Sequence, residues 1–120
     1  MSIGDWEGQK FNRLQSEQQL IERCTKDIHW CPPNGESLAI VAQRMCDAIE
    51  QIKKSHSDGS TVLVVSHGAA TAIAIATLIH NDLCQWGGYH FRNCSITELT
   101  LKDGANLGSF DDCSHLGMFG

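Results

Sequence analysis

The stretch Thr61-Val62-Leu63-Val64-Val65-Ser66-His67-Gly68-Ala69-Ala70 carries the strongest structural signal in this chain. Its β-branched, apolar run over residues 61–65 predicts a buried strand. The alanine-rich segment over residues 69–79 predicts a buried helix. We therefore expect His67 and Gly68 on a strand-to-helix turn, which is where a parallel α/β sheet places its ligands.

A helix that begins after His67 would offer unpaired N–H groups and the positive end of its dipole, and these together bind anions. A histidine beside such donors indicates phosphate chemistry. The alternative is a strand-end histidine that bonds only to backbone. A serine hydrolase fails on spacing, because its nucleophile motif is G-x-S-x-G and Val64 stands where the first glycine should be. Ser66 is expected to be structural.

Length and charge limit the possible classes of function. The chain has 120 residues, enough for one domain with a single core. Its formal net charge of −5 argues against nucleic acid and against anionic membranes as main partners. The first residues, Met1-Ser2-Ile3-Gly4-Asp5, lack the regions of a signal peptide, and the apolar segment 69–79 is too short to span a bilayer. We expect a soluble, cytoplasmic protein.

Six cysteines are a high count for a chain of this length. Because nothing in the sequence signals secretion, we expect reduced, partly buried thiols rather than a disulfide framework. Two groups could be read as metal ligands, namely Cys84 with His90 and Cys94, and Cys113 with His115. Neither has the spacing of a zinc finger, so the sequence predicts no metal site and no cofactor.

Apolar periodicity predicts the remaining elements. Apolar residues recur at three- and four-residue steps over residues 38–54, which predicts an amphipathic helix with Glu36 in its first turn. Residues 11–24 predict one or two surface helices. Residues 95–101 alternate apolar and polar side chains, and with residues 105–110 they predict a hairpin. The order helix, strand, helix, hairpin indicates an α/β fold.

Four stretches match motifs of one enzyme family in the family's own order. Gly4-Asp5-Trp6-Glu7-Gly8 resembles its G-x-W-E-G segment, and Pro33-Asn34-Gly35-Glu36-Ser37 resembles its P-x-G-E-S helix start. Val64-Val65-Ser66-His67-Gly68 resembles its second-histidine motif. Asn93-Cys94-Ser95-Ile96-Thr97-Glu98-Leu99, with Cys113-Ser114-His115-Leu116 beyond, resembles its closing hairpin. On these residues the chain resembles the histidine phosphatase superfamily, the phosphoglycerate mutase-like enzymes.

The resemblance implies a three-layer α/β domain with helices on both faces of the sheet. Members of the family begin with a strand that ends in Arg-His-Gly, whose histidine is the phosphorylated nucleophile. No arginine of this chain is followed by histidine. The family's proton-donating glutamate would fall one residue before Met1. We therefore expect residues 1–120 to form a single domain that is truncated at its N-terminus, with Met1 as a candidate internal methionine.

By this resemblance His67 is the second active-site histidine, which donates hydrogen bonds to the transferring phosphoryl oxygens. The N–H groups of Gly68 and Ala69 would complete the phosphate-binding set. Glu36 could be catalytic, but a helix-start carboxylate is the more ordinary interpretation, and Glu7 receives no catalytic role from the resemblance. The remaining histidines are expected at the surface or satisfied in the core.

The implied reaction is phosphoryl transfer through a phosphohistidine, with a phosphorylated small molecule or phosphate as ligand. Because the nucleophile is missing, the isolated chain is expected to be inactive. Two alternatives stay open: a non-catalytic module that binds a phosphate ligand or contacts another subunit, and one half of a split phosphatase. We also expect a homodimer, or a partner chain that completes the sheet. Substrate identity and the choice between mutase and phosphatase are not encoded in these motifs.

Overall fold

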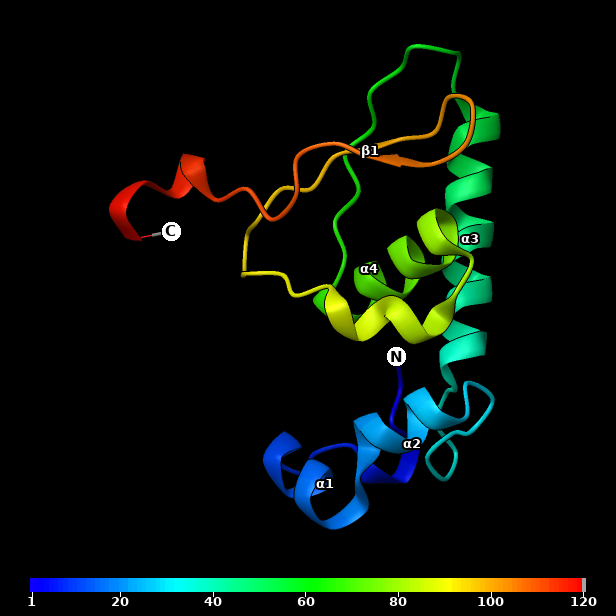
Figure 1. Cartoon of the computed structure of the whole chain (residues 1–120), viewed down its shortest axis with the longest axis vertical. Coiled ribbons are helices and arrows are strands. Elements are labelled where there is room, and N and C mark those ends of the chain that lie inside the picture. Colours follow the sequence, from blue (N-terminus) through cyan, green and yellow to red (C-terminus); the bar gives the residue numbers. More distant parts are fainter. Residues whose placement is uncertain (120) are drawn as a thin grey trace.

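The computed structural model describes residues 1–119, which form helices, helical turns and one short hairpin (Figure 1). The helices are α1 (Phe11–Gln18), α2 (Leu20–Lys26), α3 (Leu38–Ser55) and α4 (Gly68–Ile75). The shorter helical turns are η1 (Gly4–Trp6), η2 (Ala76–His80), η3 (Leu83–Gly88) and η4 (Ser114–Phe119). The strands are β1 (Leu99–Thr100) and β2 (Asn106–Leu107). Helices and a small sheet together confirm the mixed α/β class.

The expected surface helices at the N-terminal end are present as two separate helices. They are divided at Gln19, which adopts the left-handed conformation with φ 51°. Each helix contributes only a few side chains to the core, with Leu14 from α1 and Leu20 and Cys24 from α2 buried. Apart from the exposed Phe11, their other faces are mostly polar, in agreement with the composition of residues 11–24.

The amphipathic helix is present as α3, one residue longer than predicted at its C-terminal end. Ser37 caps it, because its side chain accepts a hydrogen bond of 3.2 Å from the N–H of Ile40. Burial is confined to the first two turns, at Leu38, Val41 and Ala42. The prediction for Glu36 was wrong, since this residue precedes the cap and lies outside the first turn.

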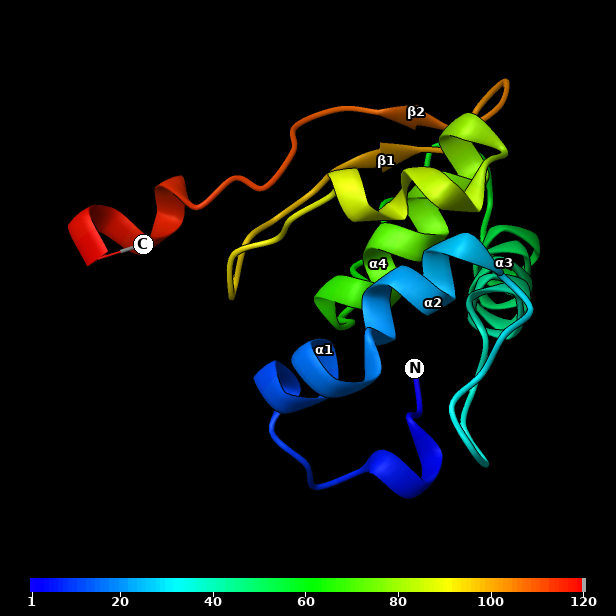
Figure 2. The same cartoon turned by 60° about the horizontal axis from the view of Figure 1, so that its bottom comes forward.

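Helix α4 and its continuation η2 form the centre of the core. Five of the eight residues of α4 are buried, and Ile73 and Ala76 are fully enclosed. The helix packs against α3 on one side and η3 on another (Figure 2). Burying a side chain such as Ile73 contributes about 1.5–3 kcal/mol of folding free energy. This helical run ends at His80, one residue beyond the predicted 69–79, and Asn81 follows in the left-handed conformation.

The strand predicted over residues 61–65 is not formed. The segment connects α3 to α4 (Figure 1) and pairs with no strand among the described residues. Its side chains are largely exposed. Leu63 is 85% exposed and Val65 is 89% exposed. A strand exists only through its ladder of hydrogen bonds to a neighbour. The β-branched residues therefore predicted a strand, whereas forming one needed a neighbour that these residues lack within the described part of the chain.

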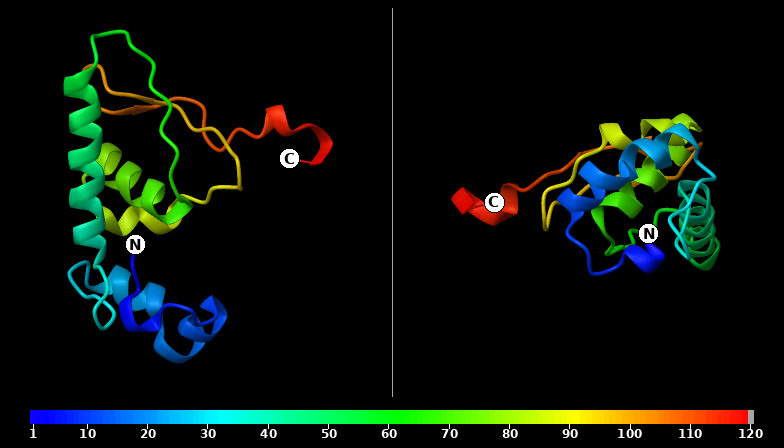
Figure 3. Two further views of the ribbon diagram at one scale, coloured as in Figure 1. Left: turned by 180° about the vertical axis from the view of Figure 1, so that it is seen from behind. Right: turned by 90° about the horizontal axis from the view of Figure 1, so that it is seen from below.

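The closing hairpin is present but shorter than predicted. Leu99 pairs with Leu107 and Thr100 with Asn106 in antiparallel register. One further bridge joins Ile96 to Asp112. Figure 3 shows the segment after this bridge, residues 114–119, projecting away from the helices.

The dimensions of the molecule reflect these exposed parts. Its principal extents are 46 × 37 × 22 Å, with a radius of gyration of 15.6 Å. A compact domain of this length has a radius of gyration of about 13.6 Å. No helix within residues 1–119 combines the length and the apolar character needed to cross a membrane.

Candidate phosphate-binding site

His67 lies at the N-cap of α4, directly before the first helical residue. Its backbone is extended, with φ −107° and ψ 149°. Its carbonyl oxygen accepts two hydrogen bonds from Thr71, one from the N–H at 2.9 Å and one from the hydroxyl at 3.0 Å. No side chain caps the helix, and the imidazole of His67 is exposed. The ring is thus free to contact a ligand at this helix end.

The first turn of α4 presents backbone donors beside this imidazole. Because Thr71 donates to His67, the three N–H groups before it, from Gly68 to Ala70, have no acceptor within the helix. They point toward the N-terminal end of α4, which is also the positive end of its dipole. This arrangement can stabilise an anion without any charged side chain.

A pocket of about 390 Å³ opens beside the same turn. Gly68, Ala69 and Ala72 of α4 form one wall. Phe11, Trp86 and Phe91 are among the residues that face them from other parts of the chain. His67 itself does not line the pocket, so the structure brings Gly68 and Ala69 to the pocket wall and leaves His67 next to it.

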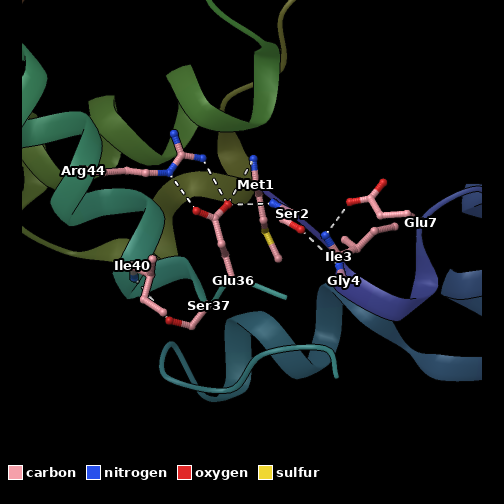
Figure 4. A network of polar contacts seen from close by, with 9 residues as sticks. All are labelled: Met1, Ser2, Ile3, Gly4, Glu7, Glu36, Ser37, Ile40 and Arg44. Carbon is pink, nitrogen blue, oxygen red and sulfur yellow. Dashed lines mark hydrogen bonds and ion pairs between the residues drawn. The ribbon is translucent and has the colours of Figure 1, made fainter. Parts of the chain in front are cut away.

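The N-terminal residues are held near this pocket by a polar network centred on Glu36 (Figure 4). Glu36 Oε2 accepts a hydrogen bond of 2.7 Å from the N–H of Ser2, and the N-terminal amine of Met1 lies 3.8 Å away. Arg44 Nε donates to Glu36 Oε1 at 2.9 Å, and its Nη2 donates to Oε2 at 3.1 Å. Arg44 holds the pKa of the Glu36 carboxyl below its usual value, with a further contribution from the Ser2 N–H.

This network assigns Glu36 a structural role. Both of its carboxylate oxygens are engaged, and it does not line the pocket. Glu7 is also engaged locally, because its Oε1 accepts from the N–H of Ile3 at 2.8 Å. Neither carboxylate is positioned to donate a proton at α4 in this structure.

The G-x-W-E-G and P-x-G-E-S segments contact each other through close backbone approach. The N–H of Asp5 donates to the carbonyl of Pro33 at 2.9 Å, and the side-chain amide of Asn34 donates to both oxygens of Asp5. A Cβ on Gly4 would stand 2.1 Å from the Pro33 oxygen, so no side chain fits there. Two motifs separated in sequence therefore meet, and they hold Ile3 at the wall of the pocket.

His90 is a pocket residue for which the sequence offered only a surface or core position, or a metal site with Cys84 and Cys94. It lines the pocket beside Tyr89 and Phe91, in the irregular segment after η3. The clustering of Trp86, Tyr89 and Phe91 within six residues was a signal of an aromatic wall, but the absence of periodicity gave no indication of where they point.

The candidate metal ligands do not assemble. Within the described part of the chain, no three side chains of His, Cys, Asp or Glu lie close enough to share one metal ion. All six cysteines are unpaired thiols. Burial raises the pKa of the Cys24 thiol, which keeps that group neutral.

Comparisons with known proteins agree with the motifs. The chain is 28% identical over 124 residues to the probable phosphoglycerate mutase GpmB of Erwinia tasmaniensis, which covers 97% of this chain. The chain spans 57% of the length of that relative. No solved structure matches the chain significantly. The family model described as histidine phosphatase superfamily (branch 1) matches residues 1–108. This chain therefore belongs to the histidine phosphatase superfamily.

Proposed function

We propose that this chain carries the second-histidine half of a site that transfers a phosphoryl group through a phosphohistidine. His67 would donate a hydrogen bond to the phosphoryl oxygens, and the N–H groups of Gly68 and Ala69 would bind them from the helix end. The observation that supports this most is the position of His67 at the N-cap of α4, beside unpaired donors and an open pocket. The ligand is a phosphorylated small molecule, or phosphate itself.

The nucleophile would come from outside these residues. No arginine in the chain is followed by histidine, so residues 1–120 lack the Arg-His-Gly motif that the family resemblance assigns to the attack on phosphorus. Charge stabilisation alone cannot replace a covalent step that does not occur. We propose that the complete domain has the three-layer architecture, with residues 1–120 as its C-terminal portion.

The first test measures binding and turnover together. In an NMR titration of the purified chain with inorganic phosphate, we expect the amide signals of Gly68 and Ala69 and the ring signals of His67 to shift. The dissociation constant should lie in roughly the millimolar range, about −4 kcal/mol, because the site lacks an arginine fork. The same chain should not hydrolyse a generic aryl phosphate above background.

His67→Ala should weaken phosphate binding severalfold, whereas His29→Ala should not change it. His29 is a suitable control because it is also exposed and lies outside the pocket. If phosphate shifted no signal of His67, Gly68 or Ala69 even at high concentration, the proposal that phosphate binds at this helix end would be wrong. If turnover were present and His67→Ala abolished it, the proposed lack of a nucleophile would be wrong.

The exposed segment 61–65 favours a second role, as a contact between subunits. Its run of consecutive apolar residues is typical of a strand buried on both faces of a sheet. We propose that a second copy of the chain, or a partner chain that also supplies the nucleophile, pairs with this segment. His67 would then lie at the junction of two chains.

A further inference from the structure

The pocket beside α4 contains no formally charged side chain. Of the described residues that line it, none is Lys, Arg, Asp or Glu. Its wall is built mainly from aliphatic side chains and from the aromatic rings of Phe11, Trp86, Tyr89 and Phe91. Its volume of about 390 Å³ lies within the range of small-molecule sites, roughly 300–1,000 Å³.

The polar atoms of the aromatic wall are already engaged with other parts of the protein. The indole N–H of Trp86 donates to Thr25 Oγ1 at 3.2 Å. The hydroxyl of Tyr89 lies 2.7 Å from Nε2 of His80. A polar or charged ligand group placed against this wall would lose water without gaining a partner, and such burial is costly.

Besides the exposed imidazole of His90, the lining includes Gly68 and Ala69, whose N–H groups have no acceptor within α4. Phe11 stands among the apolar lining residues although it is 57% exposed, so a large apolar surface is available to a ligand. The pocket thus combines the backbone donors of Gly68 and Ala69 with a wall that is largely aromatic and has no Lys, Arg, Asp or Glu side chain.

We propose that the ligand of this site is a phosphate monoester whose alcohol part is uncharged and apolar, either aromatic or branched aliphatic. This inference rests on the proposed function, because it takes the Gly68 end of the pocket as the phosphoryl site. The ring or chain of the ester lies against Phe11, Trp86 and Phe91. Esters whose alcohol carries a carboxylate, such as phosphoglycerates, are disfavoured because no Lys or Arg side chain lines the pocket and the N-terminal amine of Met1 lies 3.8 Å from Glu36 Oε2.

The test compares four ligands that the chain cannot consume: inorganic phosphate, methylphosphonate, phenylphosphonate and 3-phosphoglycerate. We expect phenylphosphonate to bind at least about tenfold more tightly than methylphosphonate, because its ring is removed from water. Only phenylphosphonate should shift the indole signal of Trp86 and the ring signals of Phe91. Binding of 3-phosphoglycerate should be no tighter than that of inorganic phosphate.

A pair of matched variants assigns the effect to the pocket. Phe11→Ala should lower the affinity for phenylphosphonate severalfold and leave that for inorganic phosphate unchanged. Ile40→Ala removes another exposed apolar side chain from a helix, outside the pocket, and should change neither. Both residues are exposed, so folding should survive both changes.

Each result that contradicts these expectations rejects a different part of the two proposals. If phosphate shifts Gly68 and Ala69 but phenylphosphonate binds no more tightly than methylphosphonate, the apolar ligand is wrong and the proposed function stands. If phenylphosphonate shifts Trp86 while no ligand shifts Gly68 or Ala69, the phosphoryl end is wrong, and both proposals fail. If 3-phosphoglycerate binds most tightly, the ligand is a phosphate ester whose alcohol carries a carboxylate, and the proposed apolar ligand is wrong.

Discussion

At the scale of single residues, Glu36 shows how one carboxylate can be mistaken for a catalytic group. Its position in the P-x-G-E-S motif made it a candidate, and its place near a helix start suggested an interaction with the dipole. In the structure its carboxylate oxygens instead accept hydrogen bonds from Arg44 and from the N–H of Ser2. Glu36 is therefore the residue that ties the first residues of the chain to α3.

This role predicts an acid-sensitive contribution to stability. The folded-state pKa of Glu36 is lowered, chiefly by Arg44, so the ion pair stabilises the fold above the unfolded pKa of roughly 4.3 and the stabilisation is lost as pH falls through the lower folded value. Glu36→Gln should remove this part of the pH dependence below about pH 4.3. Urea unfolding across this range measures it.

Glu17→Gln is the matched control for the pH measurement. Glu17 pairs with Arg13 at 2.9 Å, but both side chains are more than half exposed, and such surface pairs contribute little. An equal loss of acid sensitivity in the two variants would mean that Glu36 has no special part in the fold.

At the scale of elements, the turn η1 is joined to the loop before α3 by direct backbone contact. The carbonyl of Pro33 accepts from Asp5, and Gly35 approaches Ser2 in the same way, with its Cβ position 2.9 Å from the Ser2 oxygen. This contact holds Met1 and Ile3 against the pocket. Small residues at both points of approach are what permit it.

Gly4→Ala should destabilise the protein more than Gly8→Ala, by about 1–3 kcal/mol beyond the backbone strain, because the added methyl group overpacks the contact. Gly4 has φ +56°, and an added methyl group would meet backbone atoms of the loop. Gly8→Ala is the control, because Gly8 also has a positive φ, of +82°, but its Cβ position is open. Its cost should be limited to backbone strain, about 1–2 kcal/mol.

Urea unfolding monitored by the fluorescence of Trp6 and Trp30, whose rings lie 6.0 Å apart, follows this region directly. Equal destabilisation by the two glycine changes would show that close packing of η1 on the loop does not matter to the fold.

At the scale of the whole molecule, the apolar segment 61–65 stands out because its side chains are exposed and it pairs with no strand among the described residues. Pairing it with another strand would add backbone hydrogen bonds, at about 0.5–1.5 kcal/mol each, and would bury side chains at about 1.5–3 kcal/mol each. Exposed apolar edges of this kind recruit other chains. These gains are comparable to the whole stability of a small domain, roughly 5–15 kcal/mol.

We therefore predict that the purified chain self-associates at low micromolar concentration, as measured by sedimentation equilibrium. Changing Leu63 and Val65 together to Lys should yield a monomer that still unfolds cooperatively, because both side chains are exposed in the isolated chain. Ile40→Lys, also at an exposed apolar position, should leave the association unchanged. A wild-type chain that stays monomeric would show that residues 61–65 need no partner.

Local sequence by itself determined the helices, the turn between the hairpin arms and the place of His67 at a helix start. Apolar periodicity acts over a few residues, so the helix α3 could be predicted along the chain, whereas the division of residues 11–24 at Gln19 stayed open. Four motifs in sequence also determined the family, because they record a shared ancestry without reference to contacts.

Only the tertiary structure decided three other matters: that residues 61–65 stay unpaired, that Glu36 binds Arg44 and Ser2, and that Phe11 and Phe91 share a pocket with Gly68. Each depends on which distant residues approach one another. Burial of a strand, the partners of a carboxylate and the chemistry of a cavity wall are set by the free energy of such long-range contacts, which no local pattern contains.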